Sequence, residues 1–198
     1  TRVRAFAQDD SHIFATQDQV KDEVAALLKK VTEVYSVFGM QIEQVTIGTK
    51  PEQSLGTQEE WAPAETALKD ALDEVGWKYE IEEGDGAFYG PKIDMRIKDV
   101  LGRYWQLATI QLDFQMPQRF GLEYVSNDGT RKTPIVIHRA ILGSFERFMA
   151  IIIEQYAGAL PTWLAPVQAT IVPVSEKQNE FAEKVLAEIK SSIPLARV

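Results

Sequence analysis

Cysteine is absent from this sequence of 198 residues, and histidine occurs only twice. The chain therefore forms no disulfide, and no cysteine-rich zinc site lies within these residues. We expect a cytoplasmic location, where disulfides are rare. No apolar run approaches the roughly 20 residues that a membrane-spanning helix needs. The longest candidate, Phe148 to Ile153, is flanked by Arg147 and Glu154 and indicates a buried helix.

Net charge and the two ends of the sequence limit the interpretation further. The formal net charge is −8, which taken alone argues against a nucleic-acid binder, although a local basic patch can serve on an acidic protein. The composition is 45% hydrophobic and 25% charged, as in a folded globular protein. Thr1 is no initiator residue, the first residues show no signal-peptide pattern, and the last residues add no closing element. We therefore expect a fragment of a longer chain.

Hydrophobic periodicity predicts alternating helices and strands. Capping boxes at Thr16–Gln19 and Thr57–Glu60 precede helices that end at Gly39 and Gly76. A longer helix is predicted from about Arg139 to Tyr156. Strands are predicted over residues 2–14, 42–47, 77–81, 92–98, 104–114, 134–138 and 169–174. The order indicates an α+β domain with a mainly antiparallel sheet flanked by helices, followed by the first strand and helix of a different α/β domain.

Two predicted strands carry unusual polar faces. Strand alternation would place Arg2, Arg4, Phe6, Gln8, Asp10 and His12 on one face of the first strand. Thr109, Gln111 and Asp113 share one face of the strand over 104–114. For each strand alone, a solvated outer face explains the pattern. Two such strands side by side, flanked by long helices, indicate instead a sheet whose floor is a binding site.

Two glycine-containing segments are weaker signals. The loop from Gly84 to Lys92 could approach a phosphate closely. Its spacing matches neither a P-loop nor a dinucleotide fingerprint, so spacing alone favours an ordinary turn. Gly143, Ser144 and Arg147 lie on one side of a predicted helix start, where an arginine fork suits a phosphate. A close-packed helix with a surface arginine fits the same pattern.

The two histidines are candidates for a metal site. His12 and His138 each lie in or at the end of a predicted strand, and these strands could be neighbours. An open zinc site needs three protein ligands, and a third ligand is missing here. The alternative is two unrelated histidines, each hydrogen-bonded to backbone.

Taken together, several strings of residues resemble class II aminoacyl-tRNA synthetases. Residues 2–6 resemble the second strand of motif 2 of that class, and residues 143–147 resemble its motif 3. Within the class, the strings that resemble threonyl-tRNA synthetases are residues 2–14, 86–93, 109–114 and 137–144. Residues 161–167 resemble that family's passage into its anticodon-binding domain.

The resemblance implies a domain organisation and a reaction. Residues 1–163 would be part of the catalytic domain, and residues 164–198 would begin an anticodon-binding domain. The implied reaction joins threonine to ATP, with Mg²⁺, as threonyl-adenylate and transfers the threonyl group to tRNA(Thr). The implied parent protein is a homodimer that binds no membrane.

The resemblance also assigns roles to individual residues. His12 and His138 would bind Zn²⁺ together with an upstream cysteine. Gln8, Asp10, Tyr89 and Gln111 would surround threonine, with Asp10 as the partner of its hydroxyl group. Phe6 would stack on adenine, Arg2 and Arg147 would hold ATP phosphates, and Lys92, Thr109 and Ser144 would line the same pocket. Arg2, Lys92 and Arg147 are the candidate catalytic residues.

Some family features have no counterpart here, and rival interpretations stay open. The first arginine and glutamate of motif 2, the motif 1 strand and the editing domain are missing, so we expect residues 1–198 alone to be inactive. A prolyl or seryl enzyme is one alternative, against which the two histidines and the string from Gln8 to His12 argue. A non-catalytic synthetase-like binding module is the other, against which the retained Arg2, Phe6, Lys92, Gln111 and Arg147 argue.

Overall fold

The computed structural model describes residues 3–198. It divides into two compact units, Thr1–Ile152 and Ile153–Val198, and each is described by itself. Within the described residues, no helix is long and apolar enough to cross a membrane.

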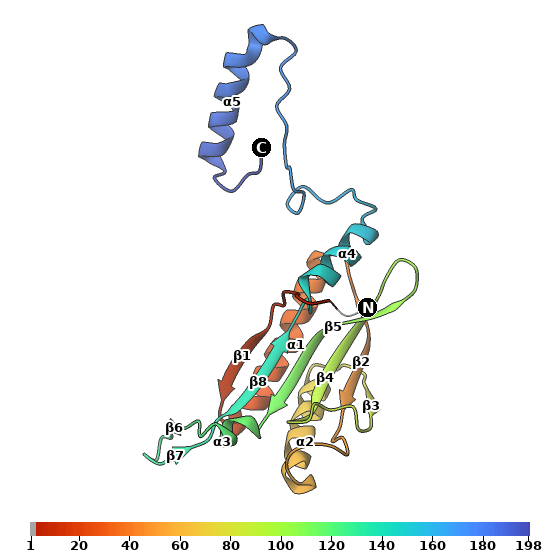
Figure 1. Cartoon of the computed structure of the whole chain (residues 1–198), viewed down its shortest axis with the longest axis vertical. Helices are drawn as coiled ribbons and strands as arrows, with labels where there is room; N and C mark the ends of the chain where they lie inside the picture. The colour runs from red at the N-terminus through yellow and green to blue at the C-terminus, as the bar shows by residue number, and fades with distance from the viewer. Residues whose placement is uncertain (1–2) are drawn as a thin grey trace. The chain divides into compact units, whose positions relative to one another are not determined.

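A six-stranded sheet forms the centre of the first unit (Figure 1). Its order is β1-β8-β5-β4-β2-β3, and every neighbouring pair is antiparallel except β2 and β3. The predicted mainly antiparallel sheet is therefore confirmed. The strands are β1 (Ser11–Ala15), β8 (Ile135–Ala140), β5 (Tyr104–Asp113), β4 (Lys92–Lys98), β2 (Ile42–Gly48) and β3 (Glu80–Glu82).

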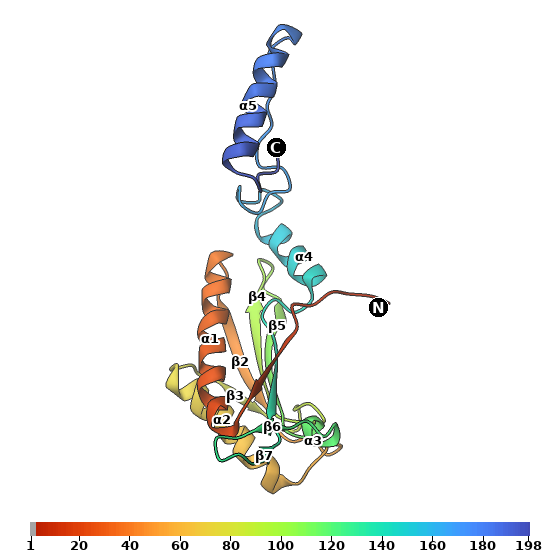
Figure 2. The same cartoon turned by 90° about the vertical axis from the view of Figure 1, so that its left-hand side faces the viewer.

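Two long helices, α1 (Val20–Val37) and α2 (Gln58–Glu74), lie on one side of this sheet (Figure 2). The box at Thr57 begins α2, where Glu60 accepts from the Thr57 N–H at 2.8 Å. The box at Thr16 begins a 3-10 turn (Gln17–Gln19) that leads into α1, and the Gln19 side chain accepts from the Thr16 N–H at 2.9 Å. Their apolar faces and one face of the sheet form the core. Its largest fully buried side chains are Trp61, Tyr35, Leu28, Ile47, Leu68, Leu72, Ile93, Met95, Ile97, Ile110, Leu112 and Ile137.

The first predicted strand is much shorter than expected. Residues 2–14 were predicted as one strand, whereas β1 begins at Ser11, and Arg2 lies outside the described residues. The reason is its partner: β8 ends at Ala140 and the chain then turns, so residues before Ser11 find no continuous strand to pair with. Gln8 alone makes an isolated bridge, with Ser144. The prediction that this strand borders the one over 104–114 is also wrong, because β8 lies between β1 and β5.

The helix predicted from Arg139 begins later, as α4 (Phe145–Gln155). Arg139 and Ala140 belong to β8, where they pair with β5. Gly143 then adopts φ 72°, a left-handed conformation that suits glycine and separates strand from helix. Between β5 and β8 lie a short helix and a hairpin that were not predicted: α3 (Met116–Arg119), β6 (Tyr124–Val125) and β7 (Arg131–Lys132).

The second unit contains a 3-10 turn (Glu176–Gln178) and α5 (Asn179–Ser192), the helix predicted from Glu176. The strand predicted over 169–174 does not form, and Val174 is 98% exposed. A strand requires a hydrogen-bonded neighbour, and the described residues of this unit supply none.

Gly90 provides a test of how the glycine-rich loop packs. A Cβ atom at this position would lie 1.7 Å from the carbonyl oxygen of Leu112, which is backbone and cannot rotate away. We expect Gly90→Ala to lower the free energy of unfolding by about 3 kcal/mol, the upper range for overpacking. Gly84→Ala in the same loop meets nothing within 4 Å and has only its positive φ of 74° to oppose it. It should cost about 1 kcal/mol. Equal losses in urea unfolding would contradict this account.

Candidate active site

Strand register gathers five of the predicted site residues on the face of the sheet away from α1 and α2. Residues opposite each other on neighbouring strands share a face. His12 lies opposite His138, His138 opposite Gln111, and Gln111 opposite Lys92, which makes one row across four strands. Thr109 and Asp94 form the next row. Residues far apart in the sequence thus meet on one polar floor.

The two histidines lie side by side on β1 and β8. Their ring centroids are 4.5 Å apart and the rings are nearly perpendicular. Asp113 Oδ2 lies 3.0 Å from His138 Nε2, and the ring of Tyr89 lies 5.2 Å from that of His138. A carboxylate on one ring nitrogen orients the imidazole and leaves the other nitrogen for a ligand. Within residues 3–198, however, no group of three metal-binding side chains is assembled.

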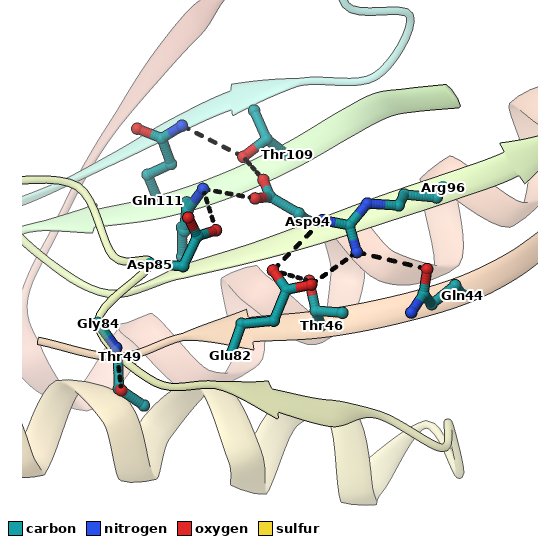
Figure 3. A network of polar contacts seen from close by, with 11 residues as sticks. Gln44, Thr46, Thr49, Glu82, Gly84, Asp85, Asp94, Arg96, Thr109 and Gln111 are labelled. Atoms are coloured by element: carbon teal, nitrogen blue, oxygen red, sulfur yellow. Dashed lines mark hydrogen bonds and ion pairs between the residues drawn. The ribbon is translucent and has the colours of Figure 1, made fainter. Parts of the chain in front are cut away.

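A connected set of polar contacts links the middle of the floor (Figure 3). The Tyr89 hydroxyl donates to Gln111 Oε1, and Gln111 Nε2 donates to Thr109 Oγ1 at 3.2 Å. Thr109 in turn donates to Asp94 Oδ1 at 2.8 Å. Burial, followed by the charges of Asp113 and Asp10, raises the pKa of Tyr89, so its hydroxyl stays protonated and can donate.

A cavity of about 690 Å³ opens over this floor. Its lining combines the N-terminal segment with β5 and the start of α4: Val3, Phe6, Gln8, Gln106, Leu107, Thr109, Gln111, Ala140, Gly143, Ser144 and Arg147. Six of these residues were candidate site residues from the sequence alone. The cavity is large enough for a small-molecule ligand, and Phe6, 59% exposed, offers it a flat apolar ring.

Arg147 stands at the start of α4, on the rim of the cavity. Its backbone N–H donates to the Ser144 hydroxyl at 3.2 Å, which makes Ser144 an N-cap. Its guanidinium lies over the ring of Trp105, 5.7 Å from the centroid, and donates to the carbonyl oxygen of Gln106 at 3.1 Å. These contacts hold a planar cation where an anionic ligand could be met.

Lys92 and Asp10 lie beside rather than in the cavity lining. The Lys92 ammonium contacts Asp94 Oδ2 at 2.7 Å and Asp85 Oδ2 at 2.9 Å. Asp10 is exposed next to β1, and its charge acts on Tyr89. Arg2, the remaining predicted residue, lies outside the described residues.

Asp9 was not singled out from the sequence, although it organises the turn before α4. Its carboxylate accepts from the N–H groups of Ile141, Leu142 and Gly143 at 2.8, 3.0 and 3.1 Å. Glu146 reaches back to the Ala7 N–H at 2.9 Å. No local pattern could reveal these bonds, because their partners are more than 130 residues apart in the sequence.

An antiparallel sheet whose polar floor meets a helix start bearing Ser144 and Arg147 is the arrangement of a class II aminoacyl-tRNA synthetase core. Residues 1–156 match the family model described as tRNA synthetase class II core domain (G, H, P, S and T). The chain belongs to this family. Within this family, relatives of about 50% identity are threonine–tRNA ligases.

A threonine–tRNA ligase catalytic subunit from Sulfurisphaera tokodaii is 54% identical over 193 residues, which are 96% of this chain and 36% of that protein. The crystal structure of the RNA-binding domain of threonyl-tRNA synthetase from Cryptosporidium parvum is 46% identical, with a TM-score of 0.91. The match covers 98% of this chain and 48% of the Cryptosporidium parvum chain. The chain thus spans about a third to a half of these proteins.

A prolyl-tRNA synthetase from Cryptosporidium parvum matches far less closely. It is 20% identical, with a TM-score of 0.56, over 100% of this chain and 37% of that one. At this identity the likeness shows the fold alone. The comparisons therefore favour the threonyl family over the prolyl alternative.

The Asp9 tether can be tested by stability. Asp9→Ala removes the acceptor of three partly buried N–H groups, so we expect the free energy of unfolding to fall by about 1–3 kcal/mol. Asp10→Ala, one residue along and exposed, is the matched control and should change stability by no more than about 0.5 kcal/mol. Urea unfolding of both variants measures the difference. A control as destabilised as Asp9→Ala would refute the tether.

Proposed function

We propose that this chain supplies the core of a threonine–tRNA ligase, which activates threonine with ATP and Mg²⁺ and transfers it to tRNA(Thr). The observation that carries the proposal is the cavity, which brings Phe6, Gln8 and Gln111 together with Ser144 and Arg147. The 54% identity of the chain to a threonine–tRNA ligase catalytic subunit supports threonine as the amino acid that is activated. A homodimeric parent and a cytoplasmic location stay predictions of the sequence.

The proposed first step needs positioned charge rather than a general base. The carboxylate of threonine attacks the α-phosphate of ATP, and the bond to the β-phosphate breaks to release pyrophosphate. Because the carboxylate is already a nucleophile, catalysis rests on positioning and charge neutralisation. Arg147 and Lys92 supply cations at two sides of the floor, and Arg2 is proposed as a third. Phe6 would stack on adenine, while Thr109 and Ser144 offer hydroxyl groups along the lining.

The proposed threonine pocket adjoins these residues, around Gln8, Asp10, Tyr89 and Gln111, two of which also line the cavity. Here the Tyr89 hydroxyl donates a hydrogen bond to the Gln111 side-chain amide, so both groups are held in place before a ligand binds. Asp10, as a carboxylate, can accept from the threonine hydroxyl, and valine lacks that donor. An apolar pocket alone would separate two such similar amino acids by only about a hundredfold.

We further propose that His12 and His138 are two ligands of a zinc ion. The donor set fits: two imidazoles are adjacent, and Asp113 occupies one nitrogen of His138 as an outer partner. Zinc in this position would supply a Lewis acid that takes the amino and hydroxyl groups of threonine. A third ligand, a cysteine, would come from outside this chain.

The function is tested with a full-length threonine–tRNA ligase that carries residues 1–198 in place of its own homologous segment, called the full-length ligase below. Threonine-dependent exchange of pyrophosphate into ATP is expected. Arg147→Lys keeps the charge and loses the planar fork. We expect it to lower activation at least about tenfold, or about 1.4 kcal/mol of transition-state stabilisation. Exchange driven by proline or serine instead of threonine would refute the proposed function.

The zinc proposal is tested separately by metal content. In the full-length ligase, His12→Ala or His138→Ala should remove zinc and weaken threonine binding together, while ATP binding largely survives. Asp10→Ala, between Gln8 and His12 in the proposed pocket, is the control: it should keep zinc and lose threonine affinity. Elemental analysis and equilibrium binding give both readouts. Loss of zinc with unchanged threonine affinity would show that the metal is structural.

A further inference from the structure

One buried carboxylate on the floor has no role in the function proposed above. Asp94 lies on β4 between Lys92 and Arg96, and its side chain is only 1% exposed. Burying an unpaired carboxylate is costly, so such a group is retained only with partners. Asp94 has two on the floor: Lys92 Nζ lies 2.7 Å from Oδ2, and Thr109 Oγ1 donates to Oδ1 at 2.8 Å.

The two oxygens of Asp94 therefore hold two candidate site residues at once. Through Thr109, the contact continues to Gln111 and then to Tyr89 (Figure 3 labels Asp94, Thr109 and Gln111). Through Lys92, the Asp94 carboxylate sets the position of an ammonium group on the same face of the sheet. Since β4 and β5 pair in register here, the backbone fixes Asp94 directly opposite Thr109.

Lys92 has a second carboxylate partner that differs in one respect. Asp85 lies 2.9 Å from the same ammonium group, but its side chain is 52% exposed. Exposed ion pairs contribute little, because water screens them. Burial opposes the charge of Lys92, but its ion pairs with Asp94 and Asp85 outweigh burial, so the pKa of Lys92 is raised above its ordinary value.

We propose that Asp94 is a positioning residue, which fixes the Lys92 ammonium group and the Thr109 hydroxyl group for amino-acid activation without touching either substrate. This inference rests on the proposed function, because it assigns a purpose to the order of that same floor. Asp94 thus acts from beneath the cavity lining, through its contacts with Lys92 and Thr109. Asp85, by contrast, shields the lysine from outside and is dispensable for its position.

The experiment compares Asp94→Asn, Asp85→Asn and Asp94→Glu in the full-length ligase. Each variant and the unsubstituted ligase are assayed for threonine-dependent pyrophosphate exchange from pH 7 to about pH 11.5, which reaches above the ordinary lysine pKa, with thermal unfolding as a check of folding. Asp94→Asn should lower kcat at least about tenfold, while KM for ATP and threonine changes less than about threefold. Asp85→Asn should change kcat by less than about threefold.

The pH profile separates positioning from general stability. The charged groups in contact with the Lys92 ammonium are Asp94 and Asp85, and the Tyr89 phenol is also within electrostatic reach. Removing the Asp94 charge lowers the pKa of Lys92, so the alkaline limb of activity should move about one unit to lower pH. The pKa of Tyr89 is itself raised by burial, so this phenol loses its proton only at the alkaline end of the pH range of the assay. Asp94→Glu keeps the carboxylate and should restore the alkaline limb.

Each outcome decides one claim. A folded Asp94→Asn variant that matches Asp85→Asn in kcat and in pH profile would overturn the inference. If Asp94→Asn does not fold, Asp94→Glu decides, because a folded variant whose alkaline limb moves despite the retained carboxylate would overturn it as well. If the unsubstituted ligase shows no threonine-dependent exchange, the proposed function itself fails, whatever the variants do.

Discussion

The backbone pairing of β8 with β1 on one side and β5 on the other is the constraint on which the site depends. It sets His12 against His138 and His138 against Gln111. Side chains alternate along a strand, so a slip of one residue would turn His138 into the apolar core and bring Ile137 onto the polar floor. Burial of Ile137 against the helices, at 0% exposure, opposes such a slip. The hydrophobic core thus determines which polar groups meet.

Each buried charged group on the polar floor needs a hydrogen-bond or ion-pair partner. Asp94 is matched by Lys92 and Thr109, and Asp113 accepts from the N–H groups of Gln115 and Met116 in addition to its contact with His138. Buried pairs of this kind add little to stability compared with apolar side chains of similar size. Their presence on one face, opposite a mainly apolar face, is therefore better explained by ligand binding than by folding.

Sequence patterns predicted the elements whose signals are local. Capping boxes and helical periodicity were sufficient for α1 and α2, and alternation was sufficient for β4 and β5. The same alternation was misleading over residues 3–10, because a strand also needs a partner and β8 ends too early to provide one. Long-range contacts, such as those of Asp9 and Asp94, have no signature in sequence spacing. The resemblance named most of the cavity lining, whereas the carboxylates beneath and beside it emerged only from three-dimensional register.

The side-chain bonds of Asp9 and Glu146 have a consequence for local unfolding. Residues 3–10 are joined to the sheet by one isolated bridge and by these carboxylates, rather than by a continuous ladder. Segments held in this way open at lower free energy than paired strands. Because the bonds run between this segment and residues 141–146, opening of either part breaks the same contacts. We therefore expect the two parts of the cavity lining that carry Phe6 and Arg147 to order together, so that a ligand bound against one part also stabilises the other.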